Sequence, residues 1–301
     1  RPDILIVLGD RFEMYAVALA ALAFKIPIAH IHGGEVTEGA IDDALRHSIT
    51  KFSHLHFTST EAYAQRVRQL GEEDWRITVS GAPGLDNLNV YQLPAIEDIE
   101  KRLGLDLSTP PILVTFHPVT LELEDTKLHI TNLLNTLASV SAPIIFTAPN
   151  ADPSSNIIRQ SLEKFIASHS NTVLFQNLGT YYYFGIMKEA QVMVGNSSSG
   201  IIEAASFELP VVNIGTRQKG RIHGKNIINT DYDSRSIFLA LTRAMKIEFK
   251  RSLNGMVNPY GDGNAAQKIV DVIRETPIDS RLLMKSFADL STPSNEKEIH
   301  E

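Results

Sequence analysis

The sequence lacks cysteine, an excess of positive charge and any long apolar run, and each absence excludes a class of protein. With no cysteine among 301 residues, disulfide bonds, thiolate catalysis and Cys-ligated zinc or iron–sulfur centres are excluded. The 28 Lys and Arg are outnumbered by 35 Asp and Glu, giving a net charge of -7, which argues against nucleic-acid or membrane partners. The longest apolar stretch, around residues 17–24, is far shorter than the roughly 20 residues that span a bilayer. Since the absence of cysteine fits a reducing compartment, we expect a cytoplasmic protein.

The composition that is present is ordinary for a globular protein. Hydrophobic residues make up 43% and charged residues 21% of the chain, and the length predicts two domains. The chain begins at Arg1 without a methionine and enters at once the apolar run 4–8, which is typical of a buried parallel strand. We therefore expect a fragment that begins within its first domain, which would then be incomplete at its N-terminus.

Short β-rich runs alternate with helical patterns along most of the chain, which predicts an α/β fold with parallel sheets and crossover helices. The expected strands are 4–8, 27–31, 55–58, 76–79, 112–116, 143–147, 173–175, 192–194 and 211–214. The expected helices are 13–24, 41–52, 61–70, 126–138, 156–167, 181–188, 200–207 and 235–245.

A polar, proline-containing stretch interrupts this alternation once, between residues 88 and 111. It divides the chain into two doubly wound, Rossmann-like domains, with ligand expected in the cleft where the carboxyl ends of their strands face each other. The predicted boundaries are 1–93 for the first domain, 94–110 for a linker, 111–290 for the second domain with a return helix, and 291–301 for a polar tail.

The first candidate site follows the opening strand. The sequence GDRFE at 9–13 places Asp10 and Arg11 directly after a glycine that frees the backbone to turn. The two opposite charges are expected to point towards the ligand. The alternative is a helix cap combined with a surface salt bridge.

The second candidate site is HIHGGEVTEGAIDDALRH at 30–47. His30 and His32 share one face of a strand, and Glu35 follows a pair of glycines. On the next helix, Asp42 and Asp43 each precede a cationic partner by four residues. So many ionisable groups around one turn favour acid–base chemistry. Solvated salt bridges on the helix, or a metal site formed by the two histidines and the glutamate, are the alternatives.

The third group lies in the second domain. His117 follows the first strand, and GNSSSG at 195–200 joins a later strand to a helix, so that backbone N–H groups and hydroxyls form a phosphate cradle. Glu203 is expected in the first helical turn, within reach of ribose hydroxyls. The cationic loop 217–221 supplies charge for a diphosphate, and Asn150 follows another strand. Because the sequence contains neither GxxxxGK[ST] nor GxGxxG, the cradle suits a sugar nucleotide better than ATP or a dinucleotide.

Taken together, the motifs of the chain resemble the UDP-N-acetylglucosamine 2-epimerase family from about residue 2 to 274. The motifs that carry the resemblance are GDRFE, HIHGGE with IDDALRH and SITK, HPVT, GNSSSG, GTRQKGR and NPYGDG. The spellings GDRFE and HGGE with IDD resemble its hydrolysing branch, which serves sialic or legionaminic acid synthesis. The resemblance implies a GT-B-like fold, a nucleotide held mainly by the second domain, no cofactor, no metal and a homodimer.

The resemblance also implies residue roles. Asp10 and Asp42 resemble the catalytic carboxylates, and His117 resembles a histidine that contacts the substrate. Some hydrolysing members carry a catalytic Glu where this chain has His32, so the acid–base role stays open between His32 and Glu35. The nucleotide contacts implied are Arg11, Ser197 and Ser198 at or near the diphosphate, Arg217 at the diphosphate or on the base side, Glu203 at the ribose, and Asn150 at the nucleotide.

The resulting hypothesis is a hydrolysing UDP-N-acetylglucosamine 2-epimerase. The enzyme would eliminate UDP from a UDP-2-acetamido sugar and hydrate the glycal to the free 2-epimer, N-acetylmannosamine or a diacetamido relative. The alternatives are a GT-B glycosyltransferase, a metal hydrolase centred on His30, His32 and Glu35, and a nucleotide-binding fragment without catalysis.

Overall fold

The computed structural model describes residues 1–38, 41–150 and 154–289. Its contacts divide the chain into two compact units. The first unit comprises residues 1–35, 44–80 and 267–301, and the second comprises 36–43 and 81–266. No helix in the described ranges combines the length and apolar character that crossing a membrane requires.

The first unit contains a four-stranded parallel sheet in the order β1-β2-β3-β4. Its strands are β1 (Leu5–Leu8), β2 (Ile28–Ile31), β3 (Leu55–Thr58) and β4 (Ile77–Val79). Its helices are α1 (Phe12–Ala23), α2 (Ile41–Phe52), α3 (Glu61–Gln69), α12 (Ala265–Glu275) and α13 (Ser280–Leu283), with a 3-10 turn at Asp74–Arg76. α2 and α12 each begin within a segment grouped with the second unit.

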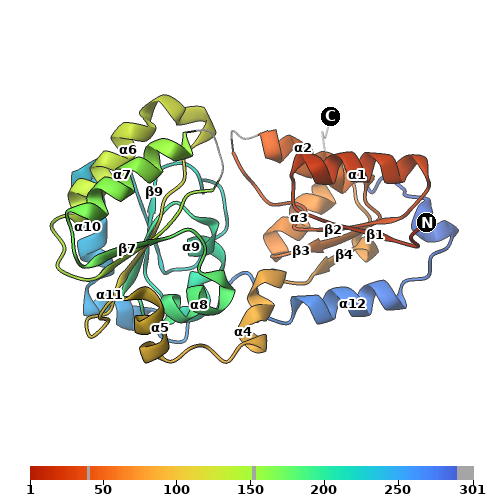
Figure 1. The fold of residues 1–301 in the computed structure, drawn as a ribbon. Helices are drawn as coiled ribbons and strands as arrows, with labels where there is room; N and C mark the ends of the chain where they lie inside the picture. Colours follow the sequence, from red (N-terminus) through yellow and green to blue (C-terminus); the bar gives the residue numbers. More distant parts are fainter. Residues whose placement is uncertain (39–40, 151–153, 290–301) are drawn as a thin grey trace, which may run out of the picture. The chain divides into compact units, whose positions relative to one another are not determined.

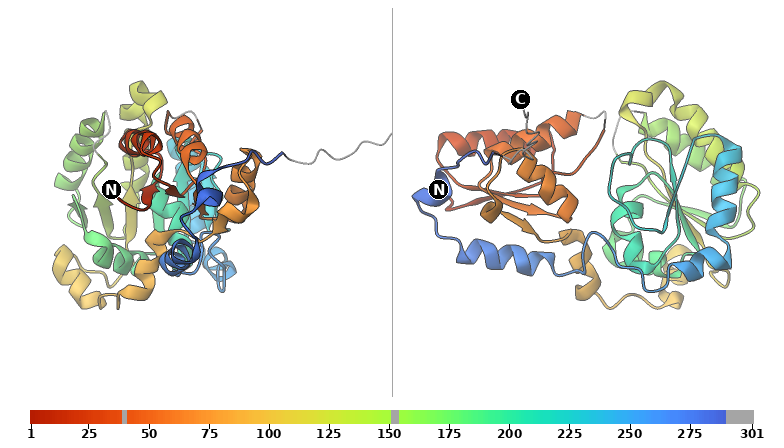
Figure 2. Two further views of the ribbon diagram at one scale, coloured as in Figure 1. Left: turned by 90° about the vertical axis from the view of Figure 1, so that its right-hand side faces the viewer. Right: turned by 180° about the vertical axis from the view of Figure 1, so that it is seen from behind.

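Helices cover both faces of this sheet. Ala18 of α1 and Ile49 of α2 pack with Val7 and Ile28 in one apolar cluster. Ile269 of α12 packs on the opposite face with α13 and the other side of β2 and β3, and Figure 2 shows α12 on the side of the sheet away from α1. Side chains alternate between the two faces along a strand, and the central strands β2 and β3 are buried throughout, as in other parallel sheets. Ile6 and Leu8 of the edge strand β1 are more than half exposed.

The second unit contains a six-stranded parallel sheet in the order β10-β9-β8-β5-β6-β7. Its strands are β5 (Ile112–Thr115), β6 (Ile144–Thr147), β7 (Thr172–Phe175), β8 (Val192–Gly195), β9 (Val211–Ile214) and β10 (Ile227–Thr230). Its helices are α4 (Asn87–Val90), α5 (Ile96–Leu103), α6 (Thr126–Leu137), α7 (Ser155–Ala167), α8 (Gly179–Glu189), α9 (Ser198–Ile202), α10 (Ser234–Ala244) and α11 (Ile247–Ser252). Short 3-10 segments lie at Pro83–Asp86, Thr120–Asp125 and Ala204–Phe207.

The second sheet is also covered on both faces. Apolar residues of α6, α7 and α10 pack on one face, and those of α5, α8 and the segment 204–207 pack on the other (Figure 1). The strand order reverses between β5 and β8, so the carboxyl ends of these neighbouring strands flank a switch point where α/β proteins bind ligands.

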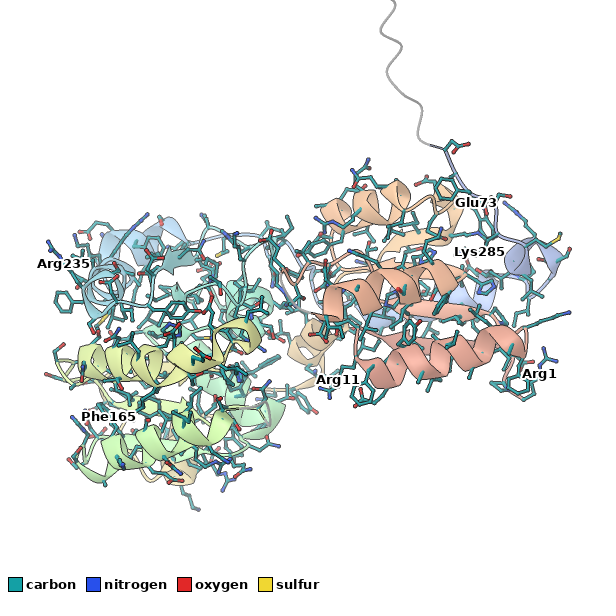
Figure 3. The ribbon with its side chains drawn as sticks, turned by 90° about the horizontal axis from the view of Figure 1, so that it is seen from above. Arg1, Arg11, Glu73, Phe165, Arg235 and Lys285 are labelled. Carbon is teal, nitrogen blue, oxygen red and sulfur yellow. The ribbon has the colours of Figure 1, made fainter. Side chains whose placement is uncertain are left out.

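The C-terminal segment returns to the first unit and is fixed there by polar contacts. The buried guanidinium of Arg76 donates to the carbonyl oxygens of Arg281, Leu282 and Met284. Lys285, labelled in Figure 3 next to Glu73, donates to the carboxylate of Glu72 at 2.7 Å. These contacts, with the buried side chain of Leu282, anchor the segment to the edge of a small sheet.

The contact-based division differs from the predicted boundaries in two respects. The stretch 94–110 was expected to be a linker, but it contains the amphipathic helix α5, whose Ile99 is fully buried against α8. Residues from Gln267 onwards, expected in the second domain, are grouped with the first unit. The predicted tail 291–301 lies outside the described residues.

Candidate functional site

In the first unit, charged side chains gather at the carboxyl ends of β1 and β2. Asp10 follows Gly9, whose φ of 75° turns the chain after β1. The guanidinium of Arg46, only 1% exposed, forms an ion pair with Asp10 and donates to the carbonyl oxygen of Glu35 at 2.9 Å. A buried guanidinium therefore holds the Asp10 carboxylate and the backbone of the next turn in a fixed relation.

The turn after β2 requires a glycine at position 34. β2 ends at Ile31, and His32 already has a φ of 67°, a conformation that costs a residue with a Cβ about 1–3 kcal/mol. At Gly34, with a φ of 78°, a Cβ would lie 2.3 Å from the carbonyl oxygen of Tyr63. His32 is therefore turned out of the strand that carries His30, and the expectation that both lie on one strand face is wrong.

The turn brings His32 and Glu35 together. Nδ1 of His32 lies 2.6 Å from Oε1 of Glu35, and the same oxygen accepts a hydrogen bond of 2.8 Å from the hydroxyl of Ser59. Glu35 is 4% exposed, whereas the His32 side chain is partly exposed. The structure thus places an imidazole at the surface of the turn and its carboxylate partner beneath it.

His30 does not fit the metal-site interpretation. Its Nε2 is bonded to the carbonyl oxygen of Gly9 at 2.9 Å and its Nδ1 to the hydroxyl of Thr50 at 3.1 Å, so both ring nitrogens are engaged. Burial lowers the pKa of His30 to about 3, so the ring is neutral at physiological pH. The described part of the chain contains no group of three His, Asp or Glu side chains that could hold a metal ion. The geometry therefore disfavours a metal hydrolase centred on this turn.

Two other predicted residues of this region occupy different positions. Arg11 is exposed at the start of α1 and forms a surface ion pair of 3.2 Å with Glu13 (Figure 3). Asp42 lies in the first turn of α2, one turn before Arg46. The neighbouring Asp43 accepts a hydrogen bond of 2.9 Å from the backbone N–H of Thr37, which holds the loop before the helix.

In the second unit, the site is built at the end of β8. Gly195 has a φ of 138°, and a Cβ there would lie 1.9 Å from the carbonyl oxygen of Thr115 in β5. Only glycine permits this close approach. The next residue, Asn196, is fully buried. Its side chain accepts a hydrogen bond of 2.7 Å from the His117 N–H and donates one of 2.8 Å to the His117 carbonyl.

The backbone carbonyl of Asn196 is engaged as well. It accepts hydrogen bonds from Arg217 at 3.1 Å and from the side-chain amide of Gln218 at 2.9 Å. Asn196 therefore joins the His117 turn to the cationic loop. The sequence suggested only that this asparagine was one of several donors in the cradle.

The serines after Asn196 form a connected chain of hydroxyls. Ser197 caps α9 by accepting from the Ser199 N–H at 3.3 Å, and the two hydroxyls lie 2.8 Å apart. Tyr183 shares a further hydrogen bond of 2.9 Å with Ser199. Burial raises the pKa of Tyr183 to about 12, so the phenol remains protonated. α9 is only five residues long, so its dipole is small and the cradle depends mainly on these N–H and hydroxyl groups.

Two cavities in the second unit are lined in part by four of the predicted nucleotide-binding residues, Ser197, Ser198, Glu203 and Arg217. One, of about 590 Å³, is lined by residues that include Thr115, His117, Ser197, Ser199 and Glu203. The other, of about 480 Å³, has a lining that includes Ser198, Arg217, Lys219 and Arg221.

The two cavities separate residues that were predicted to act together. Ser197 and Ser198, expected to act as one pair of diphosphate ligands, line different cavities. Glu203, expected in the first turn of a helix, instead follows the last residue of α9. The N–H of Asn150 donates to Nδ1 of His117 at 3.2 Å, so Asn150 does lie beside the His117 turn.

Sequence analysis did not assign Arg46, Ser59 or Gln218 to the site. Arg46 was interpreted only as a helical partner of Asp42, because a pattern of charges four residues apart reveals nothing about contacts across the sheet. Ser59 follows β3 in sequence, and its position at the carboxyl end of a neighbouring strand was the one available signal. Gln218 lies within the cationic loop, and the sequence analysis considered only the basic residues of that loop.

Comparisons with known proteins were made for the sequence and for the fold. The family model described as UDP-N-acetylglucosamine 2-epimerase matches residues 1–274. GDP/UDP-N,N'-diacetylbacillosamine 2-epimerase (hydrolyzing) of Campylobacter jejuni is 40% identical over 292 residues, covering 96% of this chain and 76% of the relative. UDP-N,N'-diacetylbacillosamine 2-epimerase (hydrolyzing) of Legionella pneumophila is 36% identical over 288 residues, covering 95% and 74%.

The fold resembles that of solved UDP-N-acetylglucosamine 2-epimerase structures. UDP-GlcNAc 2-epimerase from Neisseria meningitidis bound to UDP-GlcNAc superposes with a TM-score of 0.77 at 21% identity, covering 91% of this chain and 77% of the other. These similarities, with the two parallel sheets, confirm the predicted α/β fold of two Rossmann-like units of GT-B type and the family inferred from the motifs. The chain belongs to the UDP-N-acetylglucosamine 2-epimerase family.

Proposed function

We propose that this protein is a hydrolysing 2-epimerase that acts on a UDP-linked 2-acetamido sugar and releases UDP and the free 2-epimer. The observation that carries the proposal is the match to two hydrolysing relatives at 36–40% identity over nearly the whole chain. Both relatives are named for diacetylbacillosamine, a diacetamido sugar, which favours such a substrate over UDP-N-acetylglucosamine. A 35% identical relative is named as a polysialic acid biosynthesis protein, which supports a role in nonulosonic acid synthesis.

The reaction needs groups that move protons to and from carbon 2. In the elimination step, a base removes the C2 proton, the C1–O bond to the diphosphate breaks, and a C1–C2 double bond forms. In the hydration step, a proton returns to the opposite face of C2 and water adds at C1. We assign the proton-handling groups to the first-unit cluster of Asp10, His32 and Glu35, with Asp42 on the following helix.

The leaving diphosphate needs cations and N–H donors. Ser197, Ser198 and Arg217 are proposed to bind it, and Glu203 the ribose. His117 and Asn150, which hydrogen bond to each other, are proposed to contact the bound substrate. Arg11, exposed and paired with Glu13, would have to leave that surface ion pair to reach a phosphate, a change that costs little because exposed ion pairs contribute little to stability. No cofactor or metal is part of the proposed reaction.

Two further expectations complete the proposal. We expect a homodimer, and the absence of cysteine supports a reducing, cytoplasmic location. A GT-B glycosyltransferase would share the nucleotide site, but it would leave the partly buried Asp10–Arg46 pair and the His32–Glu35 pair of the first unit without a chemical role.

The test is to incubate the protein in deuterated water with UDP-N,N'-diacetylbacillosamine and, separately, with UDP-N-acetylglucosamine. We expect free 2-epimer, UDP and one deuterium at C2, with the diacetamido substrate the better of the two. The proposal fails if no sugar nucleotide yields both UDP and C2 deuteration. Transfer of the sugar to an added acceptor would instead indicate a glycosyltransferase.

A further inference from the structure

Three side chains of the first unit form a hydrogen-bonded series that sequence analysis did not predict. The Ser59 hydroxyl donates to Oε1 of Glu35 at 2.8 Å, and Nδ1 of His32 lies 2.6 Å from the same oxygen. Ser59 and Glu35 are 2% and 4% exposed, and they come from the ends of β3 and β2. Of these three side chains, only that of His32 is partly exposed.

This arrangement determines where the neutral imidazole holds its proton. The carboxylate of Glu35 accepts the Nδ1–H of His32, which leaves the lone pair of a neutral ring on Nε2. Within residues 1–38, 41–150 and 154–289, His32 Nε2 has no hydrogen-bond partner. His30 differs, because both of its nitrogens are bonded inside the unit.

We propose that His32 Nε2 takes the C2 proton in the elimination step and that Ser59 is a positioning residue acting through Glu35. This inference rests on the proposed function. The C2–H electron pair forms the C1–C2 double bond, the C1–O electron pair leaves with the diphosphate, and the proton stays on the imidazolium until it is released to water. Glu35 orients the ring and balances its positive charge, and it does not itself carry the substrate proton.

Intrinsic basicity favours His32 over Asp10 in this step. A reference imidazole has a pKa of about 6.5 and a reference aspartate one of about 3.9, so a neutral imidazole is the stronger base. The Asp10 carboxylate is also held in an ion pair by the buried guanidinium of Arg46. Asp10 is left to act on the other face of C2 or to hold the sugar.

The first experiment compares kinetics of the parent with His32→Gln, Ser59→Ala and Ser59→Thr. His32→Gln is expected to lower kcat about 10²–10⁴-fold, with KM little changed. Ser59→Ala is expected to lower kcat about tenfold, the effect of losing one ordinary hydrogen bond, and Ser59→Thr to restore most of it. Ser53→Ala is the matched control, because Ser53 is also buried and donates to a backbone carbonyl away from the turn.

The second experiment does not depend on turnover. Nitrogen-15 NMR of the histidine rings, with His32 assigned from the His32→Gln spectrum, should show the neutral His32 ring protonated at Nδ1. Ser59→Ala should raise the population of the other tautomer, and Ser53→Ala should not.

The outcomes separate the two proposals. Any one of three results would overturn the inference. The first is an Nε2–H tautomer in the parent, and the second is a His32→Gln variant that keeps the parent's kcat and C2 deuteration. The third is a Ser59→Ala variant that behaves like Ser53→Ala in both experiments. If the parent releases no UDP from any sugar nucleotide while the tautomers are as expected, the proposed function fails and the positioning of His32 stands.

Discussion

Asn196 connects, through its side chain and its backbone, segments of the second unit that are far apart in sequence. Its side-chain amide is bonded to both backbone groups of His117, and its backbone carbonyl accepts from Arg217 and Gln218. The fully buried Asn196 therefore joins the turn that presents His117, through its side chain, to the loop that presents Arg217, through its backbone. We therefore expect its hydrogen bonds to contribute both to stability and to binding at the proposed nucleotide site.

Asn196→Ala would leave the N–H and carbonyl of His117 without these partners. Since an unsatisfied buried polar group costs about 1–3 kcal/mol, we expect a loss of about 2–3 kcal/mol in the free energy of unfolding, measured by urea denaturation. UDP affinity, measured by calorimetry, should fall as well. Asn213→Ala is the control, because this buried amide donates to a single side chain, that of Asn229. Equal effects of the two substitutions would contradict the role assigned to Asn196.

At the scale of elements, β2 and β3 bury three histidines in the first unit. His30 lies in β2, His56 in β3, and His54 precedes β3 and accepts the N–H of Ile28 at 3.1 Å. Burial lowers the pKa of all three, to about 3 for His30 and, with the help of Lys285 and Arg76, to about 4 for His54. These strands are therefore built around neutral imidazoles.

The first unit should consequently lose stability as the pH falls below about 6.5, the ordinary histidine pKa. The unfolded chain binds protons there, whereas the folded chain does not until the pH nears the lowered values, so protonation favours unfolding. We expect His54→Asn to reduce the loss between about pH 7 and about pH 5 by about 1–2 kcal/mol, measured by urea denaturation. The exposed His223→Asn should leave the pH dependence unchanged. A parent whose stability is constant over this range would contradict the assignment.

Glu72 makes the same region sensitive to stronger acid. Although burial opposes it, hydrogen bonds from His56, Lys285 and Lys51 lower the pKa of Glu72 to about 2. Because its pKa is lowered in the folded state, the Glu72 carboxylate stabilises the fold at pH values above about 4.5. This contribution is lost as the pH falls towards 2. The histidines thus govern stability at mildly acidic pH, and Glu72 governs it at lower pH.

The elements that the sequence predicted correctly have strong periodicity. The nine expected strands and eight expected helices are present, although the helix expected at 200–207 is divided into α9 and a 3-10 segment. β10 was missed because Ile227 and Ile228 are flanked by asparagines and form an edge strand. α5 was missed because the surrounding prolines indicated a linker, although its apolar residues recur at helical spacing.

The site was less predictable than the elements, for a physical reason. Motifs placed Asp10, His32, Glu35 and the serine cradle at strand ends, where parallel sheets collect functional groups. The contacts of Arg46, Ser59 and Asn196 depend on which strands are neighbours in the sheet and on backbone conformations such as the positive φ of His32. Neither property is local in sequence.

At the scale of the whole molecule, the two units carry different parts of the proposed chemistry. The cradle, the His117 turn and Arg217 belong to the second unit, and the groups proposed to handle protons are mostly in the first. A ligand that lacks the sugar, such as UDP, should therefore be bound by the second unit. Binding stabilises only the structure that unfolds with the site, by about 2.7 kcal/mol at a ligand concentration of about 100 times Kd.

Hydrogen exchange followed by mass spectrometry can test this division. Saturating UDP should slow exchange in the segments around β5, β8 and β9 by up to about 100-fold, because the opening that exposes them must release the ligand. The strands β1–β3 of the first unit should exchange at unchanged rates. Arg217→Ala should abolish most of the protection, whereas Arg235→Ala, an exposed arginine at the start of α10 in the same unit (Figure 3), should not. Protection confined to the first unit would contradict the assignment of the nucleotide site, because the diphosphate would then have to be held by Arg11 and its neighbours.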